Sequence, residues 1–161
     1  MEDYKSGFIY FASESVGEGH PDKLCDQISD GILDACLAHN PDAKVAMETA
    51  TKANMIVLLG ETNVSKEQVN FEQIARKVCN DVGFDSKDSG IDGNNCDVIL
   101  AVEAQDANIA NAVFESKDEA DMGAGDQGLM FGYATDEWDE ETLHPYSHYL
   151  ANKICEEMAI Q

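Results

Sequence analysis

Apolar residues recur at every fourth position after Pro21, a spacing that predicts an amphipathic helix over residues 21–38. The apolar stripe of this helix consists of Leu24, Ile28, Ile32 and Cys36. Proline is favoured in the first turn of a helix, where its missing N–H costs no hydrogen bond. The pair Asn40-Pro41 predicts that the helix ends just before it.

Strands and a second helix are predicted around this first helix. The aromatic stretch GFIYFAS, residues 7–13, predicts a first strand. Residues 43–51 and 55–61 predict an antiparallel hairpin, because the link between them is short. Ser65 and Gln68 have the spacing of a capping box and predict the start of a helix that Gly83 ends. The apolar run at residues 96–104 predicts a buried strand.

The order of these elements predicts an α+β fold, a β-α-β-β-α-β two-layer sandwich of the split βαβ type. We expect residues 1–107 to form this first domain and residues 108–122, which contain few large side chains, to be a mobile connection. Residues 123–161 predict a glycine-rich turn, an apolar strand and a helix with Pro145 near its start. One strand and one helix cannot close a core, so we expect this part to be the truncated start of a second domain.

Composition narrows the classes of partner. The chain has 161 residues, of which 10 are basic and 32 acidic, giving a net charge of -22. Such a surface repels nucleic acid and anionic lipid, so we expect neither as a partner. No signal peptide or membrane span is visible, and five scattered cysteines suit reduced thiols. We therefore expect a cytoplasmic protein.

The loop GEGHPDK places His20 and Asp22 at the positive end of the first predicted helix. A ring nitrogen, a carboxylate and a helix N-terminus together can hold a phosphate group and its metal ion. The loop matches neither of the standard glycine-rich nucleotide motifs, so an ordinary capped helix is the alternative.

Two further carboxylates lie in strands that are otherwise rich in small or apolar residues. A buried carboxylate at Glu48 or Glu61 requires a cation or hydrogen-bond donors, whereas an edge position facing water requires neither. The glycines around Asp126 allow either close approach of a ligand or a tight turn.

Other polar residues have simpler interpretations. Asp26, Asp30 and Asp34 predict a solvated acidic helix face. His144 and His148 have the spacing of a metal-binding pair but lack a third ligand nearby, so we interpret them as surface histidines.

Two long stretches carry a family resemblance. SESVGEGHPDKLCDQISD, residues 13–30, and GAGDQGLMFGYATDE, residues 123–137, resemble the signatures of S-adenosylmethionine synthetase, also called methionine adenosyltransferase. Between them, DAKVAMET, MIVLLGE and DVILAVEAQ follow the order and spacing of that family. The resemblance extends from about residue 8 to residue 137 and implies the N-terminal portion of such an enzyme.

The resemblance implies that ATP and L-methionine are joined with release of triphosphate, which is then hydrolysed. It implies that His20 binds the triphosphate side of ATP and is catalytic, that Asp22 ligates Mg²⁺ and that Glu48 ligates K⁺. Glu61 and Gln105 match methionine-binding positions.

Asp126 matches a catalytic aspartate that lines the substrate pocket of the family. The sequence departs from the family at residues 105–109, where QDANI replaces the usual Gln-Ser-Pro-Asp-Ile of a gating loop. Met47 replaces a common cysteine beside the expected potassium ligand.

The resemblance also implies an assembly, because active sites of this family lie between two subunits. We expect a homodimer or a dimer of dimers for a full-length chain. The basic residues that hold triphosphate in the family belong to segments absent here, so we expect little or no activity from these 161 residues alone. The alternative is a noncatalytic short homologue that binds and modulates a full-length synthetase.

Overall fold

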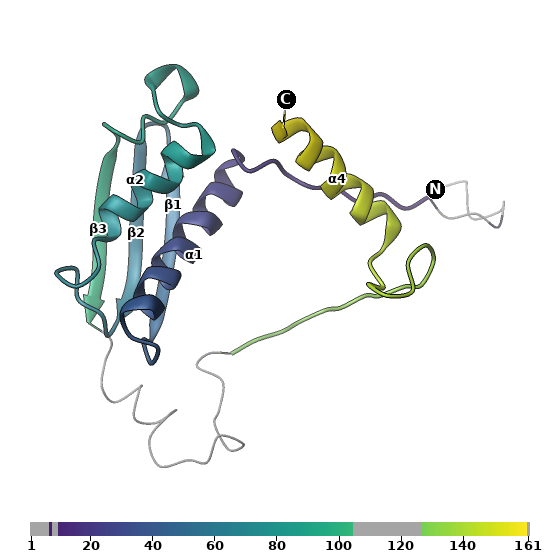
Figure 1. Ribbon diagram of the computed structural model, residues 1–161, viewed down its shortest axis with the longest axis horizontal. Helices are drawn as coiled ribbons and strands as arrows, with labels where there is room; N and C mark the ends of the chain where they lie inside the picture. Colours follow the sequence, from purple (N-terminus) through teal and green to yellow (C-terminus); the bar gives the residue numbers. More distant parts are fainter. Residues whose placement is uncertain (1–6, 8–9, 105–126, 161) are drawn as a thin grey trace, which may run out of the picture. The chain divides into compact units, whose positions relative to one another are not determined.

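The computed structural model describes Gly7, residues 10–104 and residues 127–160. The elements along the chain are α1 (Pro21–His39), β1 (Val45–Lys52), β2 (Met55–Thr62), α2 (Phe71–Val82), the short 3-10 helix η2 (Lys87–Ser89), β3 (Asp97–Ala104) and α4 (Tyr146–Ile160) (Figure 1). The described residues form two compact units. One lies within residues 18–128, and the other combines residues up to 17 with residues from 129 onward.

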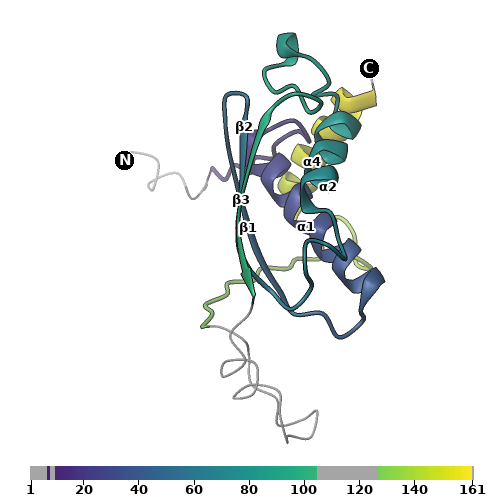
Figure 2. The same cartoon turned by 90° about the vertical axis from the view of Figure 1, so that its left-hand side faces the viewer.

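The larger unit is a two-layer α+β arrangement. Its three-stranded sheet has the order β1-β2-β3, and Figure 2 shows α1 and α2 on one face of it. β1 and β2 are antiparallel with Val45 opposite Thr62, which confirms the predicted hairpin. β2 and β3 are parallel with Met55 opposite Asp97, so α2 is the crossover between two adjacent strands. The α+β class is confirmed, whereas no strand of the described residues separates β2 from β3 as a split βαβ unit requires.

The core of this unit is the apolar stripe of α1 packed against the sheet and α2. The stripe residues Leu24, Ile28, Ile32 and Cys36 are all fully buried, as the fourfold spacing predicts. Facing them, Ile56 and Leu58 of β2 are also fully buried. Each buried aliphatic side chain contributes about 1.5–3 kcal/mol, so this contact holds α1 against the sheet.

The predicted start of the second helix was wrong by several residues. The Ser65 N–H donates to Gln68 Oε1 at 2.9 Å, but this pair stabilises a turn. α2 begins at Phe71 after the N-cap Asn70, whose Oδ1 accepts from the Gln73 N–H at 3.0 Å. Asparagine is as strong an N-cap as serine, and Phe71 is buried, so tertiary packing decided between two local signals. Gly83 ends the helix with a φ of 100°, as predicted.

Two predicted strands are not found among the described residues. Of residues 7–13, Gly7 and the residues from 10 onward are not in a strand, and residues 8–9 lie outside the described part. Residues 127–134 are likewise not in a strand, and Leu129, Met130 and Phe131 are at least 83% exposed. A strand needs a neighbour to satisfy its N–H and C=O groups, and neither segment has one in the described residues.

The smaller unit is organised around α4, the helix predicted after Pro145. The hydroxyl groups of Ser13 and Ser147 are 2.8 Å apart and join the N-terminal segment to the helix. Trp138 packs on Tyr149 with ring centroids 4.2 Å apart, and its Nε1–H donates to the His144 carbonyl. These contacts are typical of an aromatic side chain whose polar atom needs a partner.

The five cysteines are all free thiols, as expected from their scattered positions. Cys36, Cys79 and Cys96 are buried, and burial raises the pKa of the Cys79 thiol to about 11. They behave as small apolar core residues. No helix in the described part of the chain is long and apolar enough to cross a membrane.

Gly60 is the position in the sheet that tolerates no side chain. Its φ is 148°, and a Cβ atom there would lie 2.0 Å from the Ala46 carbonyl oxygen. We expect Gly60→Ala to lower the free energy of unfolding by about 3 kcal/mol or more, because strain and overlap add. Gly17→Ala is the matched control, since no atom lies within 4 Å of its Cβ position. Urea unfolding measures both variants, and equal stabilities would contradict the assignment.

Candidate functional site

The N-terminus of α1 is built by His20 and Asp22, the pair that the sequence singled out. His20 is the N-cap, and its Nδ1 accepts a hydrogen bond from the Asp22 N–H at 3.2 Å. An imidazole that accepts at Nδ1 carries its proton on Nε2. Both side chains are exposed, so an N–H donor and a carboxylate face solvent at the positive end of the helix.

We call the N-terminus of α1 with His20 and Asp22 the α1 corner. The loop before the α1 corner is held by contacts to α1 and to the segment after α2. Gln27 Nε2 donates to the Glu18 carbonyl at 2.8 Å and ties the loop to the second turn of α1. Gly19 lies against the Phe84 ring, which a Cβ atom would meet at 3.4 Å. A cavity of about 400 Å³ lies between Pro21 and the turn of the β1–β2 hairpin at Ala53. The corner therefore has a fixed base.

Glu48 and Glu61 lie on the sheet face opposite the helices. Side chains alternate along a strand, and residues 45, 47, 49 and 51 of β1 are half-buried while Glu48 is exposed. Glu61 is exposed as well, so the water-facing alternative holds for both carboxylates. Glu48 lies opposite Leu59, two positions from Glu61, which makes Glu48 and Glu61 diagonal neighbours with Cα atoms about 7–8 Å apart.

Glu103 is a third carboxylate on this face, and it was not recognised in the sequence. The parallel register pairs Glu103 of β3 directly with Glu61 of β2. Neighbouring like charges repel, so an arrangement of this kind favours a cation or an ammonium group nearby. Within the described residues, none of the three carboxylates forms an ion pair. A single carboxylate near the end of an otherwise apolar predicted strand was the available signal, but the register could not be known.

The α1 corner lies at one end of the sheet, whereas Glu61 lies near the other end and Glu48 lies in the middle of β1. Pro21 and Gly19 line a cavity together with Thr51 and Lys52, so the α1 corner lies where β1 ends. Glu61 lies near the far end of β2, about 20 Å from Met55 along the strand. The α1 corner and the Glu48–Glu61 pair are therefore not one compact cluster within one chain.

Gln105 and Asp126 lie outside the described residues. Met47 faces the helices and packs at the edge of the core, on the opposite side of β1 from Glu48. No group of three or more His, Cys, Asp or Glu side chains in the described part of the chain is arranged to hold a metal ion.

The predicted solvated acidic face of the first helix is confirmed, whereas the interpretation of His144 and His148 as surface histidines stays a prediction, since His144 is half-buried. Asp26, Asp30 and Asp34 are exposed, and Asp26 pairs with Lys23 at 3.2 Å. The rings of His144 and His148 lie 5.3 Å apart without a third metal-binding side chain among the described residues.

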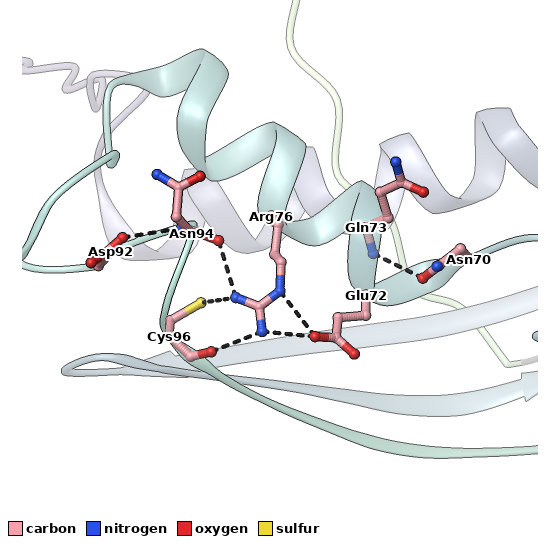
Figure 3. Close-up of polar contacts among 8 residues, drawn as sticks. Asn70, Glu72, Gln73, Arg76, Asp92, Asn94 and Cys96 are labelled. Atoms are coloured by element: carbon pink, nitrogen blue, oxygen red, sulfur yellow. Dashed lines mark hydrogen bonds and ion pairs between the residues drawn. The ribbon is translucent and has the colours of Figure 1, made fainter.

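Arg76 supports the sheet from α2, and sequence patterns did not indicate this role. Its guanidinium contacts Glu72 Oε1 at 2.7 Å, the Gly93 carbonyl at 3.1 Å and the Cys96 carbonyl at 3.0 Å (Figure 3). One side chain thus joins α2 to the segment that enters β3. The bridge anchors the segment that enters β3, whereas the pairing of β3 with β2 sets the position of Glu103.

The N-cap geometry predicts that two His20 variants will differ in their free energy of unfolding. His20→Ala removes the acceptor for the Asp22 N–H and should lower the free energy of unfolding by about 1 kcal/mol. His20→Asn keeps a capping acceptor and should be close to the parent protein in stability, while it lacks the Nε2–H donor. Urea unfolding distinguishes them, and an equal loss in both variants would contradict a capping role.

Comparison with protein families agrees with the geometry of both units. Residues 8–107 match the family model described as S-adenosylmethionine synthetase, N-terminal domain. Residues 121–161 match the model described as S-adenosylmethionine synthetase, central domain. The N-terminal match covers α1, the three strands and α2, which carry His20, Asp22, Glu48 and Glu61. The chain belongs to the S-adenosylmethionine synthetase family.

Proposed function

We propose that this chain supplies the N-terminal part of an active site that forms S-adenosylmethionine from ATP and L-methionine. The observation that carries the proposal is the pairing of an outward N–H donor at His20 with the free carboxylate of Asp22 at the start of α1. In a member of this family, the same helix start is the position expected to face the triphosphate. The five cysteines of this chain are free thiols, which is typical of a reducing compartment, so we place the activity in the cytoplasm.

His20 would act on the leaving group. With Nδ1 engaged by the backbone, its Nε2–H can donate to a phosphate oxygen without a change of tautomer. The sulfur of methionine forms a bond to the ribose C5′, and the C5′–O bond breaks with its electron pair moving to the triphosphate. A donor that is already oriented stabilises the charge that develops on that oxygen. Hydrolysis of the released triphosphate follows in our proposal.

The donor set at the helix start fits Mg²⁺. The Asp22 carboxylate is exposed, forms no ion pair in the described residues and is a hard oxygen ligand. Asp22 would hold the ion beside the phosphates, where it neutralises negative charge when bound. In a chain with a net charge of -22, such a counter-charge is required before a polyanion can approach.

The uncovered sheet face would serve methionine and K⁺. Glu61 would accept from the methionine ammonium group, together with Gln105, and Glu48 would ligate K⁺. The proximity of Glu48, Glu61 and Glu103 supports a cation or an ammonium group at this place, because like charges on neighbouring strands repel. Asp126 would line the same substrate pocket.

The separation of the two groups supports an assembly. The α1 corner lies at one end of the sheet, Glu61 lies near the other end, and Glu48 lies in the middle of β1 on the face opposite the helices, so one chain does not bring them into one cluster. The uncovered face also presents Leu59 and Ile99, which are 42% and 47% exposed. We propose that a second subunit covers this face and completes each site, as a homodimer or a dimer of dimers.

Complementation tests the proposal. The chain is mixed with a full-length family member whose own magnesium aspartate has been replaced by asparagine, and formation of S-adenosylmethionine is measured. We expect the mixture to be active, the chain alone to be inactive, and the chain with Asp22→Asn to restore nothing. Asp34→Asn is the matched control, because Asp34 is an exposed aspartate farther along α1.

Two other outcomes would contradict the proposal. Activity of the chain alone would show that no other segment is needed. Stable co-purification at a fixed stoichiometry without restored activity would favour the alternative, a noncatalytic homologue that modulates a full-length synthetase.

A further inference from the structure

Two contacts, one helical turn apart, align α1 with β1. The Ser29 hydroxyl oxygen is 2.8 Å from Thr49 Oγ1. One turn earlier, Cys25 lies beside Thr51, whose backbone forms a hydrogen bond with the Cys25 thiol. Burial raises the pKa of this thiol, and the hydrogen bond lowers it. Four helical residues rise about 6 Å and two strand residues about 6.6 Å, so both contacts fit one antiparallel alignment of helix and strand.

The hydroxyl pair differs in kind from the rest of this interface. In the described part of the chain, it is the one hydrogen bond between two side chains that joins α1 to the sheet. The other contacts are made by the apolar stripe, including Leu24 and Ile28, whose burial energy does not depend on direction. A hydrogen bond requires a narrow range of distance and angle, so this pair specifies the position of the helix along the strand.

The pair also lies between the two groups of candidate residues. Nine residues separate Ser29 from His20 along α1, which corresponds to about 13.5 Å. Thr49 is the neighbour of Glu48 on β1, and their side chains leave opposite faces of the sheet. A small shift or tilt of α1 at Ser29 would therefore move the α1 corner relative to Glu48.

We propose that Ser29 and Thr49 are positioning residues that fix where the α1 corner lies relative to the sheet. The inference rests on the proposed function for its effect on catalysis, whereas the alignment of α1 on β1 stands on the hydrogen bond itself. Neither hydroxyl would touch a substrate. Their role is to hold His20 and Asp22 in one position relative to the sheet face that a second subunit would cover, and displacements of about 1 Å at such groups can change rates about a hundredfold.

The test compares four variants of the chain. Ser29→Ala and Thr49→Val each remove one hydroxyl of the pair, and Thr49→Ser keeps it. Thr51→Val is the matched control, because it removes a hydroxyl whose 3.0 Å bond goes to the Met55 carbonyl in the hairpin and leaves in place the backbone that contacts Cys25. Urea unfolding gives the global stability of each variant, so that local effects can be separated from general loosening.

Amide hydrogen exchange provides the first readout. We expect exchange in the first two turns of α1 to accelerate about tenfold in Ser29→Ala and Thr49→Val, relative to α2 in the same protein. Thr49→Ser should match the parent, and Thr51→Val should leave the ratio unchanged. Equal acceleration in α1 and α2 of the pair variants would overturn the inference.

The Mg²⁺ dependence of the complemented activity provides the second readout, because this chain would contribute Asp22 to the restored site. Ser29→Ala and Thr49→Val should raise the Mg²⁺ concentration for half-maximal activity by about tenfold, whereas Thr51→Val should not. An unchanged Mg²⁺ requirement in both pair variants would overturn the positioning role. Failure of the parent chain to complement would instead contradict the proposed function, and the exchange ratios would still decide whether the pair aligns α1.

Discussion

The burial of the α1 stripe against β2 and α2 is the contact on which the rest of the larger unit depends. Leu24, Ile28 and Ile32 are fully buried, and they hold the helix along the sheet so that its N-terminus emerges at the β1–β2 turn. Because α1 cannot move away from the sheet without exposing the core, His20 and Asp22 lie at a defined end of the unit. Within the larger unit, α1 and α2 lie on one face of the sheet (Figure 2), and the other face is the one that we propose a second subunit covers.

Sequence patterns predicted the elements whose bounds depend on local chemistry. They failed for elements whose bounds depend on contacts with residues far along the chain. The stripe of α1, the hairpin and the Gly83 cap followed from spacing and backbone preference. The start of α2 did not, because Ser65 and Asn70 are both good caps and packing of Phe71 decided between them. Strands were expected where apolar runs occur, but a run without a neighbouring strand cannot satisfy its backbone.

The candidate site shows the same division. His20 and Asp22 could be found because a helix start is a local feature, and the capping bond followed from it. Glu103 and Arg76 could not be found in this way. The role of Glu103 depends on the strand register, and that of Arg76 depends on contacts with a loop distant in sequence. The positions of Glu48 and Glu61 on one face required the strand pairing, which the alternation of their strands alone does not determine.

The separation of the α1 corner from the Glu48–Glu61 pair leads to the central claim, that a complete site draws on two subunits. A structure of the assembled enzyme with ATP, Mg²⁺ and a methionine analogue tests this claim most directly. We predict that a single bound ligand set contacts His20 and Asp22 from one subunit and Glu61 from the other. Contacts from His20, Asp22 and Glu61 of the same chain to one ligand set would contradict it.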